Sequence, residues 1–399
     1  MKLSINYNEL GQWVAAILIF LQIEPYFVWP LHSYIVYYNT VPLLLIIGAH
    51  CRFDRFSVLE GFFLSIAVLS AVCARYNIIG IGMSALFVLI ILCDKKYLIE
   101  VFNKFRNIYV ILIAISMIVW LLVSLGVSLP YRTIPPLNSG KNIMVNAYPF
   151  LAKISPLSMS VDSLSNSVRF MGLFDEPGVV GTVSLMMLFV GKFDISKKYN
   201  IILLISGILS FSLFFYIACF VFLMYNVIVL SNYKKKYRFI VIILLFAGLY
   251  YSFQNATSYE LIWKRLEWDA SRSTITGNNR SGDELDDYVE QIKGTDAYYW
   301  GVGNKEVGER FSSAASIKNA ILRYGVVVLV LFFLFYYFYS CRYIKSFWMR
   351  LVFVAFLYMT LYQRPSFFVI HYLFLFTLSA YAYSDQYGRL FLKETKLQN

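Results

Sequence analysis

The chain has 399 residues, of which 59% are hydrophobic, 19% aromatic and only 15% charged, and its formal net charge is +12. Soluble globular domains average about 45–50% apolar and about 25% charged residues, so the composition excludes that class. It also excludes disordered chains, collagen-like repeats and disulfide-stapled scaffolds. Because a helix of ~20 apolar residues crosses ~30 Å of hydrocarbon, the long apolar runs predict an all-α polytopic membrane protein.

Twelve apolar runs occur along the chain, and we expect each to form a transmembrane helix of one integral membrane domain covering residues 1–399. The runs are 12–31, 33–49, 56–74, 77–93, 108–129, 178–191, 199–209, 212–231, 238–253, 316–340, 347–362 and 367–384.

The seventh and eighth runs need a break between them. Residues 201–230 form one apolar stretch that is too long for a single untilted span at ~1.5 Å per residue. A break at 210–212, where the chain reads Ser-Phe-Ser, puts the basic clusters at 192–198 and 234–238 on the same side. We therefore expect a broken or re-entrant helix here, facing protein rather than lipid.

The basic residues predict the orientation. With that break, twenty Lys and Arg residues fall on one side, and the short loops of the other side hold only Arg75 and Arg364. Since Lys and Arg mark cytoplasmic loops, both termini are expected in the cytoplasm. Their placement in short loops also argues against a nucleic-acid partner.

Two segments are too polar for the bilayer, and both fall on the outer side. Outer loop one covers 130–177 and outer loop two covers 252–315. Connections of this length are usually functional, so they indicate chemistry or recognition at the outer membrane surface. The alternative, that they are folded caps without a function, stays open at this point.

Outer loop one ends in charged residues where the chain re-enters the membrane. Pro177 suits the first turn of a helix, and Asp175 and Glu176 favour its N-terminus. For the two carboxylates this structural role and a role in proton transfer are equally open. Arg169 would either reach lipid headgroups or clamp a phosphate with its planar fork.

Outer loop two offers a second set of candidates. Arg280 lies just before residues 283–292, whose apolar side chains share one face of a predicted short helix. The glycines at 301–303 mark a turn rather than a phosphate loop, because no P-loop pattern follows. Lys318 and Arg323 lie at the outer end of the tenth run, where either headgroup anchoring or substrate contact would explain them.

The layout resembles the superfamily of O-antigen polymerases of the Wzy type and O-antigen ligases. The segment Arg169-x-x-Gly172-x-x-x-Glu176-Pro177 is similar to the family motif at the end of the first outer loop, with Gly178 where Asn is common. The Ser-Phe-Ser break resembles a family helix break. The order of second-loop residues is also similar: Arg280, Gly301-x-Gly303, Asn319 and Gly325. Outer loop two has no histidine, whereas the ligase branch carries one there, and this favours a polymerase.

The resemblance implies a GT-C-like glycosyltransferase of the bacterial cytoplasmic membrane, with its active site facing the periplasm. It implies transfer of a growing chain from undecaprenyl pyrophosphate onto the non-reducing end of a new lipid-linked repeat unit. A chain-length regulator and a flippase are the implied partners. A ligase-like glycosyltransferase and a carrier for lipid-linked oligosaccharides remain the alternatives.

Such a reaction needs positive charge near the phosphates and a base for the attacking hydroxyl. We expect catalytic roles for Arg169, Arg280, Glu176 and Asp175. We expect substrate contacts from Arg75, Arg364, Lys318, Arg323 and Asn319. No cofactor and no metal are expected, because the chain has no Asp-x-Asp pair and its cysteines lie in or beside apolar runs.

Overall fold

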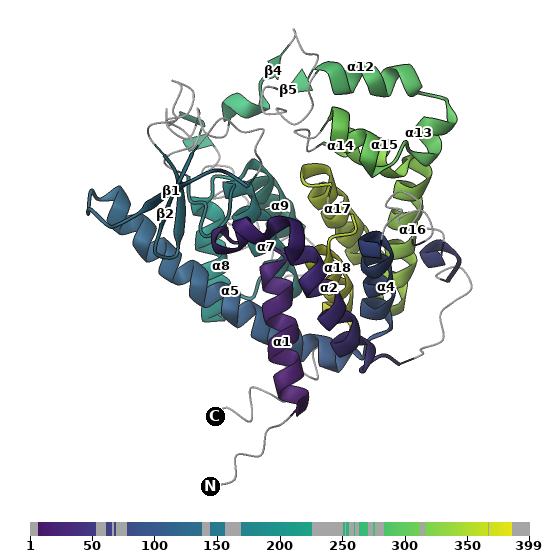
Figure 1. The fold of residues 1–399 in the computed structure, drawn as a ribbon, viewed down its shortest axis with the longest axis horizontal. Helices are drawn as coiled ribbons and strands as arrows, with labels where there is room; N and C mark the ends of the chain where they lie inside the picture. Colours follow the sequence, from purple (N-terminus) through teal and green to yellow (C-terminus); the bar gives the residue numbers. More distant parts are fainter. Residues whose placement is uncertain are drawn as a thin grey trace, which may run out of the picture.

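The structure is a computed structural model of the chain. It describes residues 7–52, 61–65, 68, 78–137, 144–155, 169–225, 250–251, 253–254, 259, 263–269, 274–275, 283–311, 316–365 and 367–384. Within them the chain is mostly helical, with two small antiparallel sheets. Long helices pack into a bundle, and the sheets and several short helices gather at one end of it (Figure 1). We call this the loop end, and we call the opposite end, where the first described helix begins and the last one finishes, the terminal end.

The bundle consists of apolar helices, as the sequence predicts. They are α1 (Tyr7–Leu21), α2 (His32–Gly48), α4 (Ile78–Leu92), α5 (Lys95–Ser124), α7 (Pro177–Val190), α8 (Lys198–Leu209), α9 (Leu213–Tyr225), α16 (Val326–Tyr343), α17 (Phe347–Gln363) and α18 (Ile370–Ala382). Two of them, α5 and α16, are long and apolar enough by themselves to cross a membrane. The predicted spans 56–74 and 238–253 lie largely outside the described residues, and the count of twelve stays a prediction.

The first predicted span is wrong in extent. Instead of one helix over 12–31, α1 ends at Leu21 and a 3-10 helix, η1 (Tyr26–Leu31), follows. Between them Glu24 has a positive φ of 58°. Pro25 comes next, and the residue before a proline is disfavoured in the α region, which explains why the helix cannot continue.

The fifth predicted span begins earlier than expected. The sequence predicts a helix over 108–129, whereas α5 begins at Lys95 because Asp94 caps it by accepting a first-turn backbone N–H at 2.8 Å. Lys95, Lys96, Lys104 and Arg106, which the predicted spans leave in a cytoplasmic loop, therefore lie on this helix. Arg106 is buried, and its guanidinium lies 3.7 Å from the ring centre of Tyr199 on α8.

The predicted break between the seventh and eighth spans is confirmed. α8 ends at Leu209, α9 begins at Leu213, and Phe211 between them has a positive φ of 46°. Ser210 and Ser212 are both buried, so the break faces protein, as expected.

The tenth predicted span is not one helix. Residues Ile317–Tyr324 form a separate helix, α15, and the chain turns at Gly325 before α16 begins. Gly325 has a φ of 81°, and a Cβ there would lie 2.2 Å from the carbonyl oxygen of Tyr299. Hydropathy alone cannot reveal this turn, because it depends on a backbone contact with outer loop two.

The two outer loops are not purely helical, which corrects the all-α prediction for these segments. In outer loop one, β1 (Arg132–Ile134), β2 (Val145–Tyr148) and β3 (Leu151–Ile154) form a three-stranded antiparallel sheet. In outer loop two, β4 (Trp268–Asp269) pairs with β5 (Thr274–Ile275) after the short 3-10 helix η6 (Lys264–Leu266).

Outer loop two also contains three short helices that pack with α15 over their own small core. They are α12 (Asp283–Ile292), which confirms the predicted helix, α13 (Asp296–Trp300) and α14 (Asn304–Arg310). The buried residues of this core are Leu285, Val289, Val307, Phe311 and Leu322.

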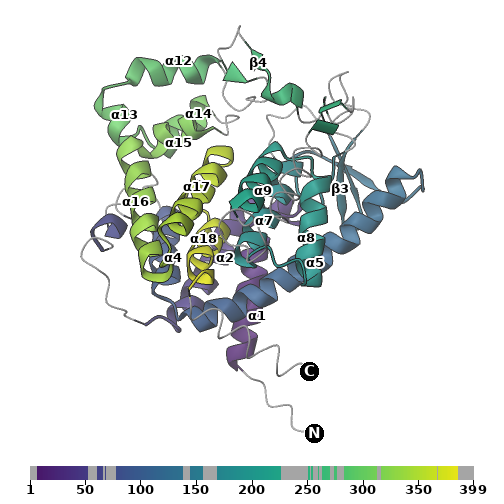
Figure 2. The ribbon, with the colours of Figure 1, turned by 180° about the vertical axis from the view of Figure 1, so that it is seen from behind.

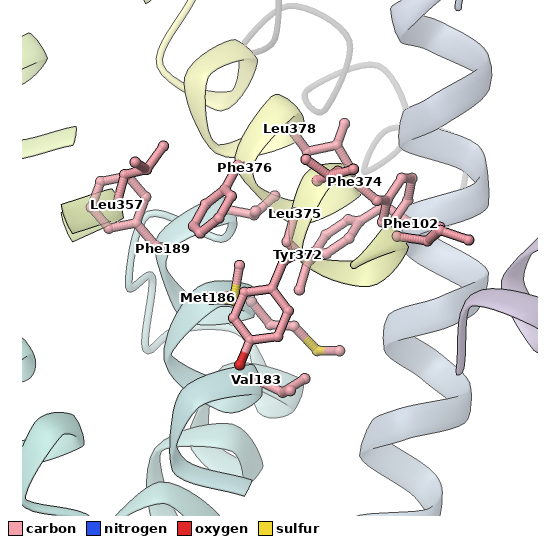
Figure 3. Packing of buried hydrophobic residues seen from close by; sticks show 14 of the residues in the cluster. Phe102, Val183, Met186, Phe189, Leu357, Tyr372, Phe374, Leu375, Phe376 and Leu378 are labelled. Carbon is pink, nitrogen blue, oxygen red and sulfur yellow. The ribbon is translucent and has the colours of Figure 1, made fainter. Parts of the chain in front are cut away.

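The main core is centred on α7 and α18. Every residue of α18 is buried, and almost every residue of α7 is buried too, as expected for helices that are apolar all round. Figure 3 shows Tyr372 and Phe376 of α18 facing Met186 and Phe189 of α7. The Phe189 ring also stacks on Phe356 of α17 at 4.1 Å, and α17 lies beside α9 (Figure 2).

Candidate active site at the start of α7

The segment 169–176 leads from outer loop one into α7, and backbone hydrogen bonds connect it to three other elements. It contacts the end of α8, strand β3 and the start of η1. The bonds run from Phe170 N–H to the Leu209 carbonyl (3.0 Å), from Ala152 N–H to the Gly172 carbonyl (2.7 Å) and from Tyr26 N–H to the Leu173 carbonyl (2.7 Å). The candidate residues of this segment are therefore held on a fixed backbone.

Gly172 explains why the segment can take this path. Its φ is 61°, a left-handed conformation that glycine adopts without a Cβ penalty. A Cβ here would also lie 3.0 Å from the Ile113 side chain of α5. The glycine three residues after Arg169 is thus required both by the turn and by the packing.

Arg169 binds the helix break. Its Nε donates to the Ser210 carbonyl at 3.1 Å, and one terminal nitrogen donates to the Phe211 carbonyl at 3.1 Å. The last carbonyls of a helix lack intrahelical partners and carry partial negative charge, so a cation is favourable there. Two of the five guanidinium N–H donors therefore stabilise the end of α8.

Glu176 and Arg364 form an ion pair that joins residues 188 positions apart in sequence. Glu176 is the N-cap of α7, yet its carboxylate makes no cap hydrogen bond and instead lies 2.5 Å from a terminal nitrogen of Arg364, at the end of α17. The side chain of Glu176 is 33% exposed and that of Arg364 is 18% exposed. Burial is the largest effect on the Arg364 guanidinium and lowers its pKa, but Glu176, Tyr372 and Asp175 together outweigh burial, so the pKa is raised above its usual value.

Two glycines on α7 make room for these groups. A Cβ on Gly178 would lie 2.9 Å from a terminal nitrogen of Arg364, and a Cβ on Gly181 would lie 2.7 Å from the Cβ of Ser212. The first turns of α7 thus contact Arg364 on one side and the helix break on the other. The Arg364 guanidinium occupies the space that a side chain at position 178 would need, and this accounts for the glycine at this position.

Further polar groups surround Arg364. Its charge interacts electrostatically with Asp175, Tyr372 and His371. The imidazole Nδ1 of His371 is buried and has no hydrogen-bond partner among the described residues. Sequence reasoning did not select His371, and the available signal was a single histidine in the last apolar run, seven residues after Arg364.

The candidates on α15 lie beside the short helices of outer loop two. Lys318 pairs with Asp286 of α12 at 2.9 Å, and the buried Asn319 donates to the Phe311 carbonyl at 3.2 Å. Both contacts hold α15 on its neighbours. Arg323 is half-buried on the same helix.

An aromatic contact joins the two regions. The ring of Tyr324, the last residue of α15, lies 5.1 Å from that of Phe368, in the connection from Arg364 to α18. The structure therefore brings Arg169, Asp175, Glu176 and Arg364 together around α7 and places α15 beside them. Arg75 and Arg280 lie outside the described residues.

No group of three or more His, Cys, Asp or Glu residues suited to a metal ion occurs in the described part of the chain. Comparison with family models, with curated proteins and with solved structures finds no match to this chain.

Proposed function

We propose that this protein is a membrane glycosyltransferase that polymerises lipid-linked oligosaccharide repeat units. The observation that carries the proposal is the arginine-rich site around the start of α7. There Arg169 binds the α8–α9 break and Glu176 pairs with Arg364, and η1, β3 and α8 hold the backbone that carries Arg169 and Glu176. The motif resemblance in the same segment supports the same reaction.

The proposed reaction replaces one glycosidic bond by another. A hydroxyl of the acceptor sugar attacks C1 of the first sugar of the growing chain, and the bond from C1 to the pyrophosphate oxygen breaks. Undecaprenyl pyrophosphate leaves with the bonding electron pair, and a carboxylate takes the hydroxyl proton. Arginine N–H donors stabilise the charge that develops on the leaving phosphate.

The Glu176–Arg364 pair suggests how the base becomes free. A phosphate that binds Arg364 competes with the Glu176 carboxylate for the same N–H donors, because both are bidentate acceptors. The carboxylate released in this way can accept the proton of the acceptor hydroxyl. Asp175, which also interacts with Arg364, is the alternative base.

The location follows from the same proposal. The loop end would face the periplasm of a bacterial cytoplasmic membrane, with both termini in the cytoplasm and the lipid tails of donor and acceptor between the helices. Arg75, Arg280, Lys318, Arg323 and Asn319 are the further substrate contacts of this proposal. A chain-length regulator and a flippase would act beside it.

Deleting the gene in its native host tests the proposal. A polymerase defect leaves single repeat units attached to the final acceptor, and expression of the intact chain restores the ladder of longer products. A ligase defect would leave no attached units, and a carrier defect would trap the lipid-linked unit in the cytoplasm. Either of the last two outcomes would overturn the polymerase assignment.

A further inference from the structure

Two thiols face each other at the terminal end of the bundle, away from the candidate active site. Cys51 follows α2, Cys93 follows α4, and their backbones form an isolated antiparallel bridge. The residue after each cysteine donates its N–H to the carbonyl of the residue before the other, in both cases at 3.0 Å. The two cysteines thus occupy a non-hydrogen-bonded pair, the position in which facing side chains approach most closely.

This position suits a covalent link. Directly opposed residues of such a pair have Cα atoms about 4.5 Å apart. A disulfide spans Cα separations of about 4.4–6.8 Å, so the two sulfurs can bond without a rearrangement of the backbone. Both cysteines are free thiols in this structure.

Cys51 is the thiol that a reagent can reach. It lines an open polar cleft of about 350 Å³, together with His50, Arg52, Asp94 and Tyr97 among others, whereas Cys93 is 2% exposed. Burial raises the pKa of the Cys51 thiol above its usual value, and the nearby ammonium of Lys95 offsets part of this rise. The order of reaction is therefore Cys51 first and Cys93 second.

We propose that Cys51 and Cys93 form a dithiol–disulfide site that reacts with small-molecule disulfides entering through this cleft. The thiolate of Cys51 attacks one sulfur of R–S–S–R, forming a mixed disulfide and releasing R–SH, which carries the proton given up by Cys51. Cys93 then loses its proton and attacks the Cys51 sulfur, and the second R–SH leaves. Two thiols are oxidised, one external disulfide is reduced, and the end of α2 is linked to the end of α4.

The test uses membranes that contain the full chain with Cys73, Cys219 and Cys341 replaced by Ser. They are treated with oxidised glutathione, and free thiols are then counted by a maleimide–polyethylene glycol gel shift. We expect both thiols to disappear together, a linked peptide containing residues 51 and 93 in mass spectra, and recovery of both thiols with dithiothreitol. If the triple variant does not fold, wild-type membranes are oxidised instead and their peptides are analysed by the same mass spectrometry. The same linked peptide of residues 51 and 93 is then expected.

The matched control keeps Cys51 and Cys341 and carries Cys93→Ser. Cys341 is half-buried near the same end of the bundle, but it does not face Cys51 across a bridge. The control should stop at a mixed disulfide with glutathione on Cys51. A linked 51–341 peptide at comparable yield, or a stable mixed disulfide in the variant that keeps Cys93, would overturn the proposal.

Discussion

At the residue scale, Arg169 has a role that its position in sequence did not reveal. It stabilises the carbonyls of the α8–α9 break at 3.1 Å, and Glu176 pairs with Arg364 rather than capping α7. Both arginines therefore have protein partners before any substrate arrives. In the proposed reaction, a phosphate that enters the site would compete with these carbonyl and carboxylate oxygens for the arginine N–H donors.

A double-mutant cycle tests the ion pair. Arg364→Gln or Glu176→Gln alone removes the nearest opposite charge from a partly buried partner, and we expect each to lower the free energy of unfolding by about 1–3 kcal/mol. The double variant should cost less than the two single variants together, with a coupling of about 0.5–3 kcal/mol. Thermal unfolding of the purified protein in detergent measures both, and strictly additive losses would mean that the two side chains do not interact.

The contact of Gly181 with the helix break makes a second prediction at this scale. Gly181→Ala places a Cβ 2.7 Å from Ser212, and we expect this overpacking to cost about 1–3 kcal/mol. The control is Gly308→Ala, since a Cβ at this exposed helical glycine meets nothing within 4 Å. Equal unfolding temperatures for the two variants would contradict the close contact between α7 and the break.

At the element scale, the sequence predicts the helices of the bundle better than their ends. The length of the apolar stretch 201–230 and its Ser-Phe-Ser interruption correctly predict the break between α8 and α9. Hydropathy does not predict the turn at Gly325, because this turn depends on a contact with Tyr299. It also does not predict the early start of α5, because this start depends on capping by Asp94. The Glu176–Arg364 pair joins residues 188 positions apart, so no local pattern could indicate it.

The turn at Gly325 can be tested against a glycine with the same backbone conformation. Gly325→Ala and Gly294→Ala both force alanine into a positive φ, 81° and 83°, but only position 325 also meets backbone atoms, whereas position 294 is open. We expect Gly294→Ala to cost ~1–2 kcal/mol and Gly325→Ala clearly more, since the second adds a collision to the same strain. Protease sensitivity of the α13–α15 segment should rise only in Gly325→Ala. Similar sensitivity of both variants would show that the backbone contact is not needed.

At the scale of the whole molecule, the fold separates two ends with different chemistry. The loop end carries the sheets and α12–α15 (Figure 1). The terminal end carries the paired thiols, since Cys51 shares its cleft with Asn8 and Gln12 at the start of α1. The predicted topology presents the two ends to different compartments. Composition and the distribution of basic residues predict which end faces which compartment.

Reporter insertions test this orientation. Ser196, between α7 and α8, and Gly294, between α12 and α13, are both exposed and lie in short connections. We expect a reporter after Ser196 to be active on the cytoplasmic side and one after Gly294 on the opposite side, since basic loops stay in the cytoplasm. Reporters active on the same side would contradict the predicted topology.

The most direct measurement of the proposed polymerase activity is the ladder of chain lengths made from a lipid-linked repeat unit by purified protein in vesicles. Wild-type protein should produce the ladder. Arg169→Lys should reduce the rate about 30- to 1000-fold while the protein stays folded, because losing one charge-assisted contact to the leaving phosphate costs ~2–4 kcal/mol and an ammonium cannot replace the planar fork. No ladder from the wild-type protein, or a normal ladder from Arg169→Lys, would contradict the assignment of polymerase chemistry to this site.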